Sequence, residues 1–301
     1  MKIVECVANF SEGRKASTTN ELAASIRSVD GCSVLDRTRD VDHNRSVITF
    51  AGAPDAVSEA AFRAITTAAC LIDLSRQSGV HPRVGAADVV PFVPIQDVEM
   101  AECVDLAHEL GGRVWRGLGI PVYFYASAAL VPHRYRLENV RRGEFEDLRT
   151  AAANDPNRAP DIGGPELHPT SGAVVIGARK LLIAWNVNLS TSDTSIAREI
   201  ARSIRESSGG LSCVKALGLH LASRDIAQVS MNLTDFEVTP MQAVIDKIDA
   251  EAERRGVEIL ETEIVGLLPR KALEGTTPER LHIRHFTPDM VLENRLYGMK
   301  Y

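Results

Sequence analysis

The chain has 301 residues, 45% hydrophobic and 25% charged, which is typical of a folded protein with one large core or two modest ones. Its formal net charge of −6 provides no basic surface, so we expect no nucleic-acid partner. No apolar run approaches the ~20 residues that span a bilayer, and the five scattered cysteines include no CxxC pair. We therefore expect a cytoplasmic protein with reduced thiols and no membrane association.

The first half of the chain predicts alternating strands and helices. Thr18 and Glu21 have the spacing of a capping box, which predicts a helix that Gly31 ends. Pro54 begins a second helix, and a third is expected to end at Gly111. The strands are apolar, β-branched runs: KIVECVAN (2–9), CSVLD (32–36), RSVITFAG (45–52), ADVVPFVPI (87–95) and IPVYFYASAAL (120–130).

The second half repeats this order. One helix ends before Gly209, and another begins at Thr239-Pro240 and ends at Gly256. The predicted strands are LLIAWNVNL (181–189), VKALGLHLA (214–222), IAQVSMNL (226–233) and VEILETEIVGLLP (257–269). Each half thus reads βαββαβ. We predict an α/β (α+β) protein with two ferredoxin-like βαββαβ-type subdomains, residues 1–176 and 177–301, with facing sheets and helices outside.

The segment between the halves, NDPNRAPDIGGPELHPTSG (154–172), is rich in Pro, Gly and Asp and has no periodic apolar face. Segments of this length are usually linkers or binding elements. Composition leaves both interpretations open, a linker between subdomains or a loop that lines a substrate site.

His81 is the strongest single candidate for chemistry. Gly79 and Pro82 place it at a bend just before an apolar strand, and Arg83 adds a neighbouring cation. Catalytic side chains often lie on such loops beside rigid elements. The imidazole pKa near 6.5 suits a group that accepts and returns a proton at neutral pH. A lone histidine is more often structural, and that alternative stays open.

A second candidate is the charged stretch LDRTRDVDHNRSV (35–47) between two predicted strands. Asp36, Asp42, Asn44 and Arg45 are its candidate binding residues. Alternating charges also suit a solvated hairpin loop whose side chains pair with each other. The functional interpretation needs a substrate with a cationic amidinium and anionic carboxylates, which carboxylates and guanidinium groups would bind.

Other motifs predict little. His282-x-x-His285 lacks a nearby Cys or acidic partner, so we expect no metal site. The glycine pairs complete neither GxGxxG nor GxxxxGK[ST], and no GxSxG or Cys-His signature indicates a covalent nucleophile.

The sequence nonetheless resembles one known family along almost its whole length. The matching stretches, in order, are VECVANFSEG (4–13), DHNRSVITFAG (42–52), SGVHPRVGAADVVPFVPI (78–95), GIPVYFYASAA (119–129), SGAVVIGARKLLIAWNVNL (171–189), IAQVSMNLTDFEVT (226–239) and EIVGLLPRKAL (263–273). They resemble the formiminotransferase family. We expect the stand-alone transferase, because the deaminase domain of the bifunctional animal enzymes has no counterpart in the sequence.

The resemblance implies transfer of the formimino group of N-formimino-L-glutamate to N5 of tetrahydrofolate, the co-substrate, in histidine degradation. It also implies a homodimer, with His81 as the catalytic acid and base. Arg45 is then a candidate for binding a substrate carboxylate, with Asp42 or Asp36 orienting His81 or the amidinium, and Asn44 and Arg83 as further substrate-binding candidates. The resemblance places folate contacts at Gly163, Gly164, Pro165, Glu166, Leu167, His168, Pro169, Thr170, Ser171, Gly172, Gly209, Gly210, Lys215 and Gly218.

Two departures and two alternatives accompany this resemblance. Thr38 stands where animal members have an acid, and Ser171 where they have a tryptophan, so the charge network and a pterin-stacking surface can differ. Formyl or other one-carbon transfer from tetrahydrofolate is one alternative. A non-catalytic folate-binding module is the other, because folds of this kind host many functions.

Overall fold

The computed structural model describes residues 1–298, which divide into two compact units, one from Met1 to Arg179 (unit 1) and one from Lys180 onward (unit 2). The predicted division after residue 176 falls inside the last strand of unit 1. In chain order, unit 1 contains β1 (Ile3–Phe10), α1 (Ala16–Arg27), β2 (Cys32–Asp40), β3 (Arg45–Gly52), α2 (Pro54–Leu71), β4 (Ala87–Gln96), α3 (Met100–Leu118), β5 (Val122–Ala126), α4 (Leu137–Arg141), α5 (Glu144–Asn154) and β6 (Val174–Ala178).

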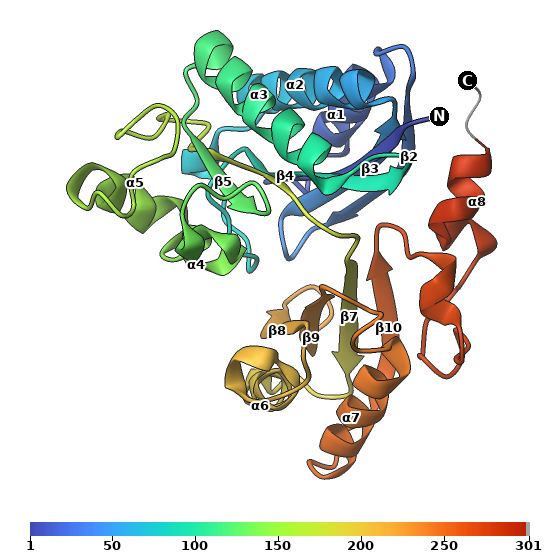
Figure 1. The fold of residues 1–301 in the computed structure, drawn as a ribbon. Helices are drawn as coiled ribbons and strands as arrows, with labels where there is room; N and C mark the ends of the chain where they lie inside the picture. Colours follow the sequence, from blue (N-terminus) through green and yellow to red (C-terminus); the bar gives the residue numbers. More distant parts are fainter. Residues whose placement is uncertain (299–301) are drawn as a thin grey trace. The chain divides into compact units, whose positions relative to one another are not determined.

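The six strands of unit 1 form one mixed sheet in the order β2-β3-β1-β4-β6-β5. The pairs among β2, β3, β1 and β4 are antiparallel, whereas β6 is parallel to both β4 and β5. Alternate side chains point to opposite faces of a strand. One face, with Phe50, Phe92 and Phe124, packs against α1, α2 and α3, which lie side by side in Figure 1.

Helices α4 and α5 cover part of the other face. Tyr123 and Tyr125 of β5, which alternate with Phe124, pack there against Val140 of α4 and Phe145 of α5. Both faces of the β4-β6-β5 part of the sheet are therefore apolar, as is typical of parallel strands covered by helices on both sides.

Unit 2 has a four-stranded antiparallel sheet in the order β10-β7-β9-β8. Numbered in chain order within each unit, these four strands have the same spatial order as β4-β1-β3-β2 in unit 1. Its elements are β7 (Ile183–Leu189), α6 (Thr194–Ile204), β8 (Val214–Leu221), β9 (Ile226–Leu233), α7 (Met241–Glu253), β10 (Ile259–Val265) and α8 (Leu292–Tyr297). The predicted βαββαβ order is thus present in both units, and the mixed α/β class is confirmed. The ferredoxin-like description and the facing sheets stay predictions.

The predicted capping box of the first helix is wrong. The helix begins at Ala16, so Thr18 and Glu21 lie inside it. The carboxylate of Glu12 instead accepts hydrogen bonds from the backbone N–H groups of Arg14 and Lys15, at 2.7 and 2.9 Å. Glu12 therefore fixes the turn ahead of the helix, whose N-cap residue, Lys15, makes no capping hydrogen bond through its side chain.

The predicted end of the third helix at Gly111 is also wrong, since α3 continues to Leu118 and ends at Gly119, which has a left-handed φ of 64°. A Cβ on Gly111 would lie 2.6 Å from Cζ of Phe124, so this glycine allows the helix to approach β5 closely. Close packing outweighs the low helix propensity of glycine here. The predicted strand 120–130 is shorter than expected, Val122–Ala126.

The segment 154–172 does not join the two units. It lies within unit 1, where Ile162 forms a bridge with Val122, and the chain leads from it into β6. The sequence did not predict β6, a run of five buried residues between β4 and β5. The linker interpretation of this segment is therefore wrong, and the loop interpretation remains.

Within residues 1–298, every helix is too short or too polar to cross a bilayer. All five cysteines are free thiols; Cys6, Cys32 and Cys103 are buried, and Cys70 is exposed.

Candidate active site

Three loops of unit 1 meet at one end of its sheet. The β1–α1 loop (11–15) follows the end of β1, the β2–β3 turn (41–44) joins two antiparallel strands, and the α2–β4 loop (72–86) leads into β4. β1 runs antiparallel to both β3 and β4, with Phe10 opposite Ser46 and Ala87. This register brings segments that are distant in the sequence to the same end of the sheet.

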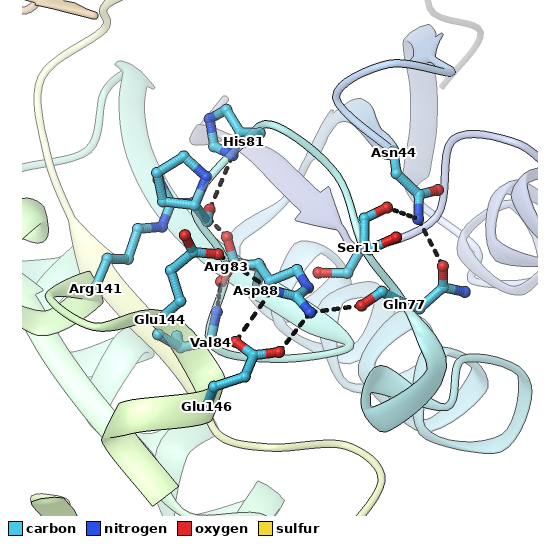
Figure 2. Close-up of polar contacts among 12 residues, drawn as sticks. Ser11, Asn44, Gln77, His81, Arg83, Val84, Asp88, Arg141, Glu144 and Glu146 are labelled. Atoms are coloured by element: carbon cyan, nitrogen blue, oxygen red, sulfur yellow. Dashed lines mark hydrogen bonds and ion pairs between the residues drawn. The ribbon is translucent and has the colours of Figure 1, made fainter. Parts of the chain in front are cut away.

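Asn44 connects all three loops (Figure 2). Its Oδ1 accepts a hydrogen bond from the backbone N–H of Gly13 at 3.0 Å. Its Nδ2 donates to Oε1 of Gln77 at 2.6 Å and to the carbonyl oxygen of Ser78 at 3.0 Å. The residue is 3% exposed and has a left-handed φ of 46°, which asparagine tolerates better than most residues. Asn44 thus supports the loop that carries His81.

Further contacts fix the backbone ahead of His81. The N–H of Val80 donates to the carbonyl oxygen of Asp42 at 3.2 Å. A Cβ on Gly79 would clash with the carbonyl oxygen of His43, so the loops approach each other as closely as they do only because residue 79 is glycine. Nε2 of Gln77 donates to the buried carboxylate of Glu12 at 3.2 Å. The position of His81 is therefore determined by backbone contacts on both sides.

The two ring nitrogens of His81 have different partners. Nδ1 lies 2.9 Å from the carbonyl oxygen of Pro82 (Figure 2), and Nε2 lies 2.6 Å from Nη1 of Arg45. A carbonyl oxygen can only accept a hydrogen bond, and a guanidinium can only donate one. His81 is consequently a neutral imidazole with its proton on Nδ1 and its lone pair on Nε2.

The surroundings of His81 favour this neutral form. Burial holds the pKa of His81 well below its usual range, and the positive charges of Arg45 and Arg141 and the nearby His43 lower it further. The His43 ring stacks on the His81 ring, with centroids 5.8 Å apart and planes 22° apart. Burial, and then Arg141, lower the pKa of Arg45 to about 10, so Arg45 is still charged at neutral pH.

A buried ion pair lies beside this pair of residues. One carboxylate oxygen of Asp88 pairs with Nη2 of Arg141, and the other accepts a hydrogen bond from the N–H of Val84 at 2.8 Å. The side chains of Asp88 and Arg141 are 3% and 13% exposed. The charged side chains that lower the pKa of the His81 ring, Arg45 and Arg141, are both positive, whereas Asp88 and Asp40 favour the charged form of Arg45, so the ring itself faces positive charge. Such a site favours an anionic ligand.

The structure brings Asp42, Asn44 and Arg45 to the His81 loop, whereas the side chain of Arg83 points away from His81 and Asp36 lies farther along β2. Arg83 directs its buried guanidinium to Glu144 and Glu146 of α5, at 3.1 and 2.8 Å, and to the carbonyl oxygen of Gln77 (Figure 2). Asp36 lies within β2 opposite Thr49, before the turn. The His81 ring is oriented by the hydrogen bond that its Nδ1–H donates to the carbonyl oxygen of Pro82, and among residues 1–298 neither ring nitrogen contacts a carboxylate.

The predicted folate loop, 163–172, divides into parts with different surroundings. Gly163 packs on the ring of Trp115, where a Cβ would lie 2.5 Å from Cε3. Leu167 belongs to the apolar core under α5. The last part adjoins the strand that follows His81, since the N–H of Ala86 donates to the carbonyl oxygen of Ser171 at 2.9 Å. The remaining predicted residues of this loop are Gly164, Pro165, Glu166, His168, Pro169, Thr170 and Gly172.

The other folate candidates lie in unit 2. Gly209 has a left-handed φ of 83° after α6, and Gly210 packs against the backbone of Ile204. Gly218 of β8 faces α6, where a Cβ would clash with the backbone of Arg198, and Lys215 is half-buried on the same strand.

Within residues 1–298, no three His, Cys, Asp or Glu side chains are grouped to hold a metal ion. His282 and His285 both have left-handed backbones, and Nε2 of His282 lies 3.5 Å from Oδ2 of Asp249.

The sequence did not indicate Arg141, Asp88 or Gln77 as parts of this site, and His43 lay within the candidate stretch 35–47 without an assigned role. Asp88 carried a signal, because an acid directly before the apolar run VVPFV needs a buried partner. No sequence signal pointed to Arg141, because it lies 53 positions from Asp88 in a short charged helix.

The chain is similar to known proteins along almost its whole length. Residues 3–179 match the family model described as the formiminotransferase domain, N-terminal subdomain, and residues 184–283 match that of the formiminotransferase domain. A glutamate formimidoyltransferase of Streptococcus pyogenes serotype M1 is 42% identical over 298 residues, 99% of each chain. One from Thermoplasma acidophilum is 45% identical over 298 residues, 98% of each chain. The formimidoyltransferase-cyclodeaminase of Gallus gallus is 43% identical, over 90% of this chain and 51% of its own.

Proposed function

The chain belongs to the formiminotransferase family, and from that premise we propose that it is a glutamate formimidoyltransferase, which transfers the formimino group of N-formimino-L-glutamate to N5 of tetrahydrofolate. The observation that carries this proposal is the neutral His81 ring, with its Nε2 lone pair next to a guanidinium in a positively charged site. Tetrahydrofolate is a second substrate in this reaction, and the pathway it serves is histidine degradation.

The reaction needs one group that moves a proton in two directions. The nucleophilic nitrogen loses a proton as it bonds to the amidine carbon, and the departing glutamate nitrogen must gain one. His81 accepts the first proton on Nε2 while Nδ1–H stays on the Pro82 carbonyl oxygen, and the imidazolium then returns a proton to the leaving amine. Acid–base catalysis of this kind contributes roughly 10²–10⁴-fold. Holding the two substrates together must supply the rest.

The carboxylates of the glutamate portion fit the cations of the site. Arg45 and Arg141 lie close enough to His81 to lower its pKa, and Nε of Arg141 is buried without a hydrogen-bond partner among the described residues. A carboxylate would satisfy such donors. We assign Arg45 to one substrate carboxylate, with Arg141 as its neighbour, while Asp42 and Asn44 stay candidates around the amidinium.

The proposed folate contacts, in the loop Gly163–Gly172 and around Gly209–Gly218, come from the resemblance to the family. The contact between Ser171 and Ala86 supports the first of these, because it brings the end of the loop beside the His81 segment. We also propose that the protein acts in the cytoplasm as a homodimer, and size-exclusion chromatography with light scattering measures its mass.

The proposed function is tested by incubating the purified protein with tetrahydrofolate and either N-formimino-L-glutamate or N-formyl-L-glutamate. We expect free glutamate and 5-formiminotetrahydrofolate from the first donor and a rate at least 100-fold lower from the second. Faster turnover of the formyl donor, or binding of folate without turnover of either donor, would contradict the proposal.

A further inference from the structure

The contact between Arg45 and His81 presents a chemical problem. Nε2 of His81 carries the lone pair that must accept a proton, yet Nη1 of Arg45 donates to it at 2.6 Å. A guanidinium has five N–H donors and no acceptor, and it does not lose a proton near neutral pH. Arg45 therefore occupies the reactive nitrogen without being able to take part in proton transfer. In this arrangement His81 cannot act as a base.

Arg45 is held by a weak partner. The ring that it contacts is uncharged and accepts at one atom, whereas a carboxylate adds the opposite charge and can accept two parallel hydrogen bonds from the same guanidinium. The carboxylate of Asp88 faces the same region but is already engaged by Arg141 and by the N–H of Val84. The like charge of Arg141 disfavours the charged form of Arg45, while Asp88 and Asp40 act in the opposite direction. An incoming carboxylate would therefore displace His81 as the hydrogen-bond acceptor of the Arg45 guanidinium.

We propose that Arg45 is a positioning residue that couples recognition of a donor carboxylate to release of the Nε2 atom of His81. Without a ligand, Arg45 masks Nε2. When a carboxylate binds, the guanidinium turns to it in a two-point contact, and Nε2 becomes available to the reacting nitrogen. This inference deepens the proposed function and rests on it for the identity of the donor.

The coupling has a consequence for specificity. A donor with an amidine but without a carboxylate, such as formamidine, would enter the site without moving Arg45. It would meet a masked base and react slowly even at saturation, so its defect lies in kcat as well as in KM. The arrangement thereby selects donors with an anionic group near the amidine before chemistry begins.

The charged and titratable groups that face His81 come from four elements. They are Arg45 of β3, His43 of the β2–β3 turn, Arg141 of α4 and, next to Arg141, Asp88 of β4. Asp40, at the end of β2, acts on Arg45. Among residues 1–298, Arg45 is the residue whose side chain contacts a ring nitrogen of His81, so its movement changes the protonation of the ring more than movement of the other groups does.

The direct test is an NMR titration of the His81 ring, assigned by its loss in His81→Gln, with and without glutarate, a dicarboxylate that lacks the amidine. In the wild-type protein we expect glutarate to move the His81 titration to higher pH. In Arg45→Gln we expect a titration that is already higher and that glutarate leaves unchanged. Arg37→Gln, which removes an exposed guanidinium bonded to Asn20, is the matched control and should behave like the wild type.

Kinetics provide the second readout. Arg45→Gln should lower kcat/KM for N-formimino-L-glutamate by about 100-fold, the loss expected for a two-point charged contact, and raise kcat for formamidine, because Nε2 of His81 is no longer masked. Arg45→Lys keeps the positive charge but cannot donate the two parallel hydrogen bonds of a guanidinium, so its kcat/KM should lie between those of Arg45→Gln and the wild type. A His81 titration in the wild type that does not respond to any concentration of glutarate, or an equal response in Arg45→Gln, would overturn the coupling. Absence of formimino transfer together with an intact glutarate response would instead overturn the proposed function alone.

Discussion

Asp88 of β4 and Arg141 of α4 form a buried ion pair that also fixes the segment after His81, because the second carboxylate oxygen of Asp88 holds the N–H of Val84. One carboxylate thus links a helix, a strand and the loop of the candidate base. Breaking such a pair from one side leaves an uncompensated charge, which costs more than the pair itself contributes.

Asp88→Asn keeps the acceptor for Val84 but removes the charge opposite Arg141. We expect the free energy of unfolding to fall by about 3 kcal/mol, as is typical when one partner of a buried pair is removed. Chemical denaturation measures this change. Asp289→Asn, at an exposed ion pair with Arg295, is the control and should change stability by less than about 0.5 kcal/mol. Equal effects of the two substitutions would show that the Asp88 pair is not effectively buried.

Asn44 supports the His81 loop through its three hydrogen bonds and its left-handed backbone. Asn44→Gly removes the hydrogen bonds but tolerates the backbone, whereas Asn44→Ala adds a steric cost of roughly 1 kcal/mol. We expect both variants to lose at least tenfold in kcat, with Asn44→Ala the less stable. Thermal unfolding and steady-state kinetics separate the two effects. If only the KM of the donor changed, Asn44 would bind substrate rather than support the loop.

Arg83 anchors the first turn of α5 through Glu144 and Glu146, whose side chains are partly exposed and can be rehydrated. Arg83→Met keeps the length and apolar volume of the side chain without its charge. We expect a stability loss of about 1–2 kcal/mol and a KM for N-formimino-L-glutamate within threefold of the wild type. A much higher KM at unchanged stability would restore Arg83 as a substrate-binding residue.

With His81 as the proposed base, the pH dependence of kcat/KM reports the protonation of His81 in the free enzyme. The base must be neutral, and burial with Arg45 and Arg141 holds its pKa well below the ordinary value of 6.5. The rate should therefore stay level as pH falls from about 8 to 6.5 and decline only at lower pH. Arg141→Gln should move this decline to higher pH. A wild-type decline centred at or above the ordinary value would contradict the neutral-ring assignment.

Protonation of His81 also affects the free energy of unfolding, which, like the rate, is expected to rise with pH. Between the lowered folded pKa and 6.5, the unfolded chain binds more protons than the folded one, so the His81 contribution to unfolding free energy increases with pH in that window.

Much of the fold was predictable because its segments carry strong local signals. β1, β3 and β4 are apolar, β-branched runs, and the helix α2 begins at a proline in its first turn. β6 was missed because its pairing partners lie on β4 and β5, about 50 or more residues away, and a short apolar run has no distinctive period. The glycine at position 111 was misleading because its reason is the nearby ring of Phe124.

The site was predictable only in part. His81 stood out through its bend, and Asn44 and Arg45 through their place at the start of a strand. The Pro82 hydrogen bond, the stacked His43 and the Asp88–Arg141 pair depend on how distant segments meet, and no local pattern encodes that. Arg83 was a candidate because it lies two positions after His81, and the direction of its side chain, toward α5, could not be predicted from that position.

The central claim is that the His81 imidazole moves the proton during transfer. The most direct measurement is the turnover of His81→Ala and His81→Gln with N-formimino-L-glutamate and tetrahydrofolate, alongside equilibrium binding of tetrahydrofolate and circular dichroism of the same samples. We predict folded variants that bind tetrahydrofolate within about threefold of the wild type and lose 10²–10⁴-fold or more in kcat. Turnover within tenfold of the wild type in either folded variant would contradict the account.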